Sequence, residues 1–133
     1  MAPVAVVIVL AVLEFVGIAW LVGRARHRYG IKAPATTGHE VFERWFRVQM
    51  NTLELLIAFI PAISLFAIYV NPNWAAWIGL VYIAGRIVYA RAYVADPGRR
   101  SLGFGLSMMP ILVLLVGALV GAVRAMLETN PGT

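Results

Sequence analysis

Charged and amide side chains recur at helical spacing where the chain turns strongly apolar. In the segment "RWFRVQMNTLELLIAFIPAISL", Arg44, Arg47, Asn51 and Glu54 follow one another at steps of three, four and three residues. Since each residue of an α-helix advances by about 100°, these steps place the four side chains in one narrow sector, with Gln49 pointing roughly the other way. A guanidinium fork matches a carboxylate, so such a stripe could hold an anionic ligand.

A second polar stripe follows in "GLVYIAGRIVYARAY", where Tyr82, Arg86, Tyr89 and Tyr93 lie at steps of four, three and four residues and Arg91 points elsewhere. An ionisable group inside a bilayer costs on the order of 2.5–3.5 kcal/mol on insertion scales, so both stripes should face protein or ligand. The excess of arginine over carboxylate favours an anion with a polar, peptide-like body.

Several of these side chains have a simpler interpretation. Arg44 and Arg91 could extend to the lipid headgroups, and Tyr93 could belong to an interfacial aromatic belt. Arg47 and Glu54 could pair with each other. Glu14, the one charge in the first apolar segment, could be a helix–helix hydrogen-bonding group or a site.

The composition indicates the class of protein that must position these residues. Of 133 residues, 62% are hydrophobic and 13% charged, whereas a soluble domain is nearer half apolar and a quarter charged. A membrane-spanning helix needs about 20 apolar residues. The sequence therefore predicts one all-α domain over residues 1–133, an up-down integral membrane four-helix bundle. The expected spans are 3–23, 41–70, 74–95 and 102–127.

Residue counts exclude several kinds of chemistry. There is no cysteine, so disulfides, thiolate metal sites and a cysteine nucleophile are excluded, and any reacting thiol must come from a ligand. His27 and His39 stand apart from any carboxylate cluster, so no metal site is predicted. Nucleic-acid binding is not expected, because the basic residues lie along a membrane face.

The basic residues also predict an orientation. All but one of the 11 lysine and arginine residues fall toward the first and third connections, and the exception is Arg124. The positive-inside rule places the basic loops 24–40 and 96–101 in the cytosol and both termini outside.

Three stretches resemble one known family of membrane proteins. They are "FERWFRVQMNTLE" at 42–54, "GLVYIAGRIVYARAY" at 79–93 and "RRS" at 99–101. Together they are similar to the membrane-associated proteins in eicosanoid and glutathione metabolism (the MAPEG family). That family includes microsomal glutathione transferases, leukotriene C4 synthase, microsomal prostaglandin E synthase and the 5-lipoxygenase-activating protein.

The resemblance implies a homotrimer with glutathione bound between neighbouring subunits in a cytosol-facing cleft. It assigns Arg100 to activation of the glutathione thiol, with Ser101 beside it. It also implies a set of glutathione-binding residues: Arg26, Arg47, Gln49, Asn51, Glu54, Arg86, Tyr89 and Tyr93. In this set Arg86 supports the pocket, and Arg26 and Gln49 contribute from the same or the adjacent subunit.

The implied activity is conjugation of glutathione, as cosubstrate, to lipophilic electrophiles from the membrane, with peroxidase activity and a role in detoxification as further candidates. His27 stands where leukotriene C4 synthase has a second arginine, and Leu55 stands where it has a tyrosine, so neither leukotriene nor prostaglandin synthesis is assigned. Two alternatives remain: a non-enzymatic lipid-binding protein of the same fold, and a small drug/proton exporter using Glu14. The arginine stripes disfavour the exporter.

Overall fold

The computed structural model describes residues 1–129, and all of its regular secondary structure over that range is helical. Four long helices follow in order, α1 (Ala2–Arg28), α2 (Glu40–Tyr69), α3 (Pro72–Ala95) and α4 (Arg100–Thr129), with the 3-10 turn η1 (Pro97–Arg99) before α4. All four are long and apolar enough to cross a membrane. Helices α1, α3 and α4 contain their predicted spans and extend past them, whereas α2 ends at Tyr69, one residue before the end of the predicted span 41–70.

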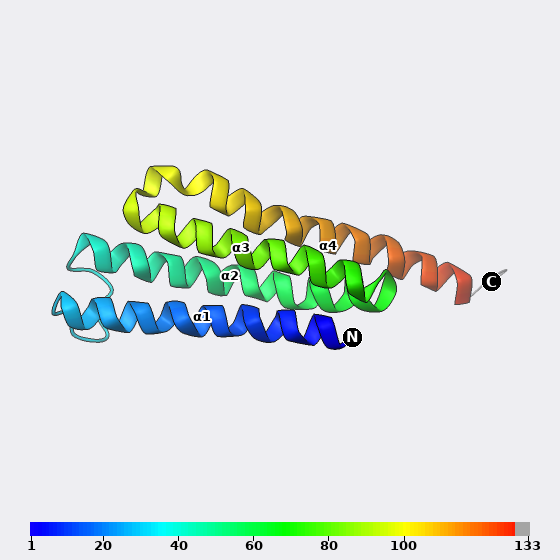
Figure 1. Cartoon of the computed structure of the whole chain (residues 1–133), viewed down its shortest axis with the longest axis horizontal. Helices are drawn as coiled ribbons and strands as arrows, with labels where there is room; N and C mark the ends of the chain where they lie inside the picture. Colours follow the sequence, from blue (N-terminus) through cyan, green and yellow to red (C-terminus); the bar gives the residue numbers. More distant parts are fainter. Residues whose placement is uncertain (130–133) are drawn as a thin grey trace.

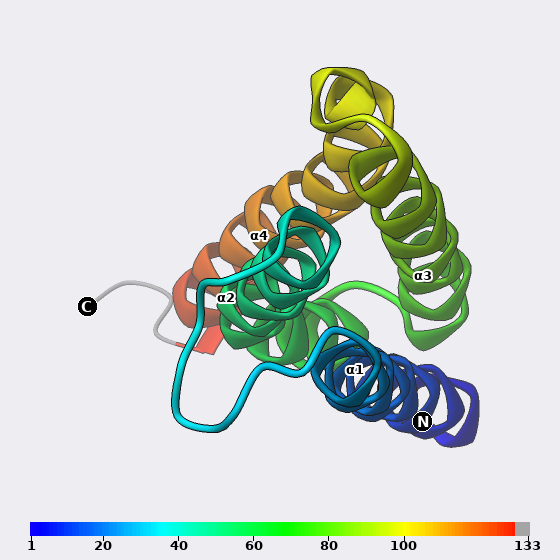
Figure 2. The ribbon, with the colours of Figure 1, turned by 90° about the vertical axis from the view of Figure 1, so that its left-hand side faces the viewer.

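The chain reverses at each connection, so that consecutive helices lie side by side (Figure 1). The start of α1 lies at the end of the bundle opposite to the α1–α2 loop and η1. Figure 2 views the bundle from the end that carries this loop and shows α1 and α4 on opposite sides of the molecule. Helices α2 and α3 each pack against all three other long helices.

Local sequence signals fix the helix starts. The Asn71 side chain accepts hydrogen bonds from the backbone N–H groups of Asn73 and Trp74, and Pro72 occupies the first turn, where a missing N–H does no harm. His39 caps α2 through Nδ1, and Asp96 accepts from the N–H of Gly98 ahead of α4. These short caps set the lengths of the second and third connections.

Two glycines allow α3 and α4 to approach closely. A Cβ atom on Gly103 would lie 2.4 Å from the backbone of Tyr89, and one on Gly85 would lie 2.6 Å from the carbonyl carbon of Leu106. Small residues commonly allow such backbone contact between membrane helices. This crossing brings the polar face of α3 against the first turns of α4.

Candidate functional site

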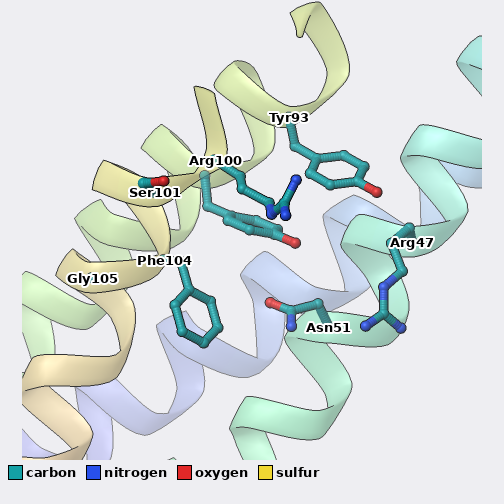
Figure 3. A pocket seen from close by; sticks show the side chains of 8 residues that line it. Arg47, Asn51, Tyr93, Arg100, Ser101, Phe104 and Gly105 are labelled. Carbon is teal, nitrogen blue, oxygen red and sulfur yellow. The ribbon is translucent and has the colours of Figure 1, made fainter. Parts of the chain in front are cut away.

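The two polar stripes meet at a cavity of about 710 Å³ near the end of the bundle that carries η1. Figure 3 shows Arg47 and Asn51 of α2 facing Tyr93 of α3 and Arg100 and Phe104 of α4 across this space. The lining comprises Arg47, Asn51, Tyr89, Tyr93, Arg100, Ser101, Phe104 and Gly105. It contains two arginines and no carboxylate, so its net charge suits an anion.

Arg86 lies behind this cavity and joins three helices. Its side chain is 0% exposed. Its Nε donates to Ser107 Oγ on α4 at 2.9 Å, and its Nη1 donates to Asn51 Oδ1 at 2.8 Å and to Thr52 Oγ1 at 3.2 Å on α2. Since Asn51 lines the cavity, Arg86 fixes the orientation of an amide that a ligand would contact.

Aromatic rings form the wall between Arg86 and the open cavity. The guanidinium of Arg86 lies 4.3 Å from the ring centroid of Tyr89, a distance typical of a cation–π contact. The Tyr89 ring lies 5.6 Å from that of Tyr93 and 6.5 Å from that of Phe104. Tyr82, which precedes Arg86 by one turn of α3, instead stacks on Phe59 in the core and does not line the cavity.

Arg100 begins α4, at the end of the helix where the dipole is positive. Its Nη1 donates to the carbonyl of Pro97 at 3.0 Å, which anchors the side chain to the preceding turn. The guanidinium lies at the cavity in Figure 3, close to Tyr93. Its charge and the helix terminus together favour an anion at this side of the cavity.

Arg44 has a role that differs from the headgroup contact considered above. Its Nη1 donates to the carbonyls of Val94 at 2.9 Å and Ala95 at 3.3 Å, which are the last residues of α3. It also pairs with Glu40. Arg44 therefore caps the C-terminus of α3 from α2, and only the relative position of the two helices could reveal this contact.

The cavity brings together five of the residues predicted for the site, namely Arg47, Asn51, Tyr89, Tyr93 and Arg100. Glu54 reaches it indirectly, because its Oε1 lies 3.4 Å from Arg47 Nη1 in a half-exposed ion pair. Gln49 does not line the cavity within this subunit. Neither does Arg26, whose Nη1 donates to the carbonyl of Ala35 at 2.8 Å.

Sequence reasoning missed three contributors. Thr52 and Ser107 complete the hydrogen bonds of Arg86, and Phe104 closes one wall of the cavity. Ser107 lies in an apolar run and gives no pattern by itself. Phe104 follows Arg100 by one helical turn, which is the one signal that could have placed it beside the predicted site.

A second depression of about 430 Å³ adjoins the cavity along α4. Its walls are apolar apart from Ser101, and it shares Ser101 and Gly105 with the polar cavity. The other lining residues come from α3 and α4: Ile78, Val81, Leu102, Leu106, Met109, Pro110 and Val113. The arginine-lined cavity and an apolar groove thus meet at the first turns of α4.

This arrangement can support one kind of chemistry in particular. The cavity can bind a polar anion through Arg47 and Arg100, while the groove can accept an apolar molecule from the bilayer. The two ligands would meet beside Arg100. A guanidinium there would stabilise a developing or pre-formed anion on a nucleophile brought by the polar ligand.

Comparison with known proteins agrees with this geometry. The chain is 47% identical over 116 residues to an uncharacterized protein, sll1147, of Synechocystis, covering 87% of this chain and 85% of that one. It is 40% identical over 110 residues to microsomal glutathione S-transferase 2 of Mus musculus (83% and 75% covered). It is 32% identical over 120 residues to leukotriene C4 synthase of Cavia porcellus (90% and 80% covered). Residues 4–120 match the model of the MAPEG family, and the chain therefore belongs to that family of membrane proteins.

Proposed function

We propose that this protein transfers glutathione to lipophilic electrophiles within the membrane. The observation that carries the proposal is the junction of the two sites: the arginine-lined cavity and the apolar groove share Ser101 and Gly105. A hydrophilic tripeptide and a membrane-soluble molecule can therefore meet there. Relatives named as microsomal glutathione S-transferase and leukotriene C4 synthase support the same class of reaction.

Glutathione offers two carboxylates, one ammonium group, two amides and a thiol. Arg47 suits one carboxylate, and the Asn51 amide suits the peptide-like body. Glu54, already paired with Arg47, provides the negative charge for the ammonium group. The hydroxyls of Tyr89 and Tyr93 complete the set from α3. These contacts hold the tripeptide in register and thus act by positioning.

Arg100 is the catalytic residue in this proposal. A free thiol has a pKa of about 8.5 and is mostly protonated at neutral pH. The Arg100 guanidinium beside the sulfur lowers the free energy of the thiolate and so increases the fraction of the reactive form. The thiolate then donates its electron pair to the electrophilic carbon, and a leaving group departs with its bonding pair or an opened ring takes up a proton.

We also infer a homotrimer spanning the membrane in up-down fashion, with the α1–α2 loop and η1 in the cytosol. Arg26 and Gln49 do not line the cavity of their own subunit, so a neighbouring subunit would have to supply them. Native mass spectrometry in mild detergent should show three chains. A monomer that binds glutathione with full affinity would contradict the assignment of Arg26 and Gln49.

Turnover and binding measurements test the function itself. The purified protein should bind glutathione, show the ultraviolet difference absorbance of a bound thiolate and conjugate chlorodinitrobenzene. Arg100→Ala should lose the thiolate signal and most of the turnover. Arg99→Ala is the matched control, because Arg99 precedes Arg100 and its side chain is 80% exposed. Loss of the signal in both variants, or in neither, would contradict a specific role for Arg100.

The apolar groove favours one competing function, a lipid-binding protein without catalysis. Retention of a fatty ligand in the groove without any glutathione turnover would support that alternative.

Peroxidase activity is a separate outcome. There, two glutathione molecules are oxidised to the disulfide while an organic hydroperoxide is reduced to an alcohol and water. An assay with a hydroperoxide in place of chlorodinitrobenzene distinguishes the two activities.

A further inference from the structure

A second polar cluster lies between α1 and α3, away from the arginine-lined cavity. A depression of about 420 Å³ there is lined mainly by apolar residues, including Ile18, Trp45 and Ala90. Glu14 of α1 and Arg86 of α3 both contribute to it. The fully buried Arg86 therefore connects two compartments: it donates to Asn51 on one side and lines this depression on the other.

Both residues have polar atoms without a hydrogen-bond partner. Within residues 1–129, both carboxylate oxygens of Glu14 and the Nη2 of Arg86 are buried, and none of these three atoms has a hydrogen-bond partner. The three hydrogen bonds that Arg86 does make all go to neutral acceptors, on Ser107, Asn51 and Thr52. A buried guanidinium without an opposite charge is strongly unfavourable, so this one needs a counter-ion.

The other acidic residues are placed elsewhere. Glu40 pairs with Arg44, Glu54 with Arg47, and Asp96 with Arg99. Glu43 accepts from the N–H of Gly38 in the first connection, and Glu128 lies in the last turn of α4. Glu14 is the only acidic residue of α1, and α3 has none.

Electrostatics connects Glu14 with the same cluster. Glu14 and Arg86 lie within range of mutual Coulombic attraction. The Tyr82 hydroxyl, also buried and without a partner among residues 1–129, lies within electrostatic range of both. The three groups thus form one polar cluster at the α1–α3 contact, and Glu14 and Arg86 line the same depression.

We propose that Glu14 is the counter-ion of Arg86 and, through it, a positioning residue for glutathione. Glu14 holds the guanidinium from α1, the guanidinium holds the Asn51 amide, and Asn51 faces the ligand. The second part rests on the proposed function. The first part concerns only the apo protein and can be tested without glutathione.

Thermal unfolding in detergent tests the counter-ion. Glu14→Gln and Arg86→Gln each leave one buried charge uncompensated and should each lower the unfolding temperature. The double variant leaves no uncompensated charge, so its decrease in unfolding temperature should be clearly smaller than the sum of the decreases in the two single variants. Glu128→Gln, the same change at the end of α4, should have no effect. Additive losses would overturn the counter-ion assignment, whether or not the protein binds glutathione.

Glutathione affinity tests the positioning role. Glu14→Gln should raise the Kd about three- to thirtyfold, which lies within the range expected for coupled neighbours. In an Asn51→Ala background the same change should have little further effect, because the amide through which Glu14 acts is gone. A merely structural role for Glu14 predicts equal effects in both backgrounds, and that result would overturn the positioning role.

A conservative variant covers the case in which Glu14→Gln does not fold. Glu14→Asp keeps the charge on a shorter side chain. It should unfold at a higher temperature than Glu14→Leu and bind glutathione with nearly wild-type affinity. If Glu14→Asp and Glu14→Leu behaved alike in both measurements, the charge at this position would have no role.

Discussion

Replacing Arg86 by lysine separates the geometry of the guanidinium from its charge. The guanidinium donates through Nε to Ser107 on α4 and through Nη1 to Asn51 and Thr52 on α2. A lysine ammonium has all its donors on one nitrogen and cannot reach both helices, so about two of the three bonds should be lost. Interhelical hydrogen bonds in membranes contribute about 0.6–1.7 kcal/mol each, which gives a loss of about 1–3 kcal/mol.

The loss should also reach the cavity. In Arg86→Lys, the Oδ1 of Asn51 is no longer held by a guanidinium that is fixed to both α2 and α4, so glutathione should bind more weakly. Because Arg86 does not touch the sulfur in the proposed site, kcat should change less than the glutathione Kd. Ser107→Ala removes one of the three bonds of Arg86 together with the bond from Ser107 Oγ to the carbonyl of Gly103, and it should show a loss of stability with a smaller change in Kd.

Two measurements on one detergent preparation check this prediction: unfolding monitored by tryptophan fluorescence, and glutathione binding by calorimetry. Arg91→Lys is the matched control, since Arg91 lies five residues later on the same helix and is exposed. We expect the control to resemble the wild type in both measurements. If Arg86→Lys did so too, the three hydrogen bonds would contribute nothing measurable and the assignment of Arg86 as the support of Asn51 would be refuted.

Three further predictions concern the reaction, the helix crossing and the orientation. Turnover of Arg100→Ala should rise with pH toward the ordinary thiol pKa of about 8.5, while the wild type should level off at lower pH, as measured by initial conjugation rates. Parallel profiles would exclude thiolate stabilisation by Arg100. Gly103→Ala should destabilise the protein by about 1–3 kcal/mol, because the new Cβ would lie 2.4 Å from the backbone of Tyr89, whereas Gly23→Ala has open space and should be tolerated in a thermal scan. Since the chain has no cysteine, Thr37→Cys and Asn73→Cys provide unique labelling sites, and an impermeant thiol reagent added outside intact cells should modify only the latter.

Much of the architecture follows from local sequence signals. Apolar length predicts the four helices, and the caps at Asn71 and Asp96 mark two of the turns. Helical periodicity places Arg47 with Asn51 and Tyr89 with Tyr93 on common faces. We expect these two faces to meet because ionisable groups avoid lipid. The hydrogen bond between Arg86 and Asn51 joins the two faces in the structure.

Other contacts could not be predicted because they depend on how one helix is placed against another. Arg44 reaches the end of α3 only because the two helices have one particular axial offset. The partner of Arg86 on α4 is Ser107 because Gly85 and Gly103 set the crossing point, and a shift of one turn would present a different side chain. Periodicity gives the face of a helix on which a residue lies but not the height of its neighbour.

The sequence by itself determined the membrane class, the four helices and the residue types available for binding an anion, since these depend on composition and on the fixed angle between successive residues. Only the tertiary structure decided which of those residues surround one cavity, which support it from behind, and that the cavity joins an apolar groove at Ser101 and Gly105. The physical reason is that close backbone contact at glycines, rather than any local pattern, fixes the register between α3 and α4.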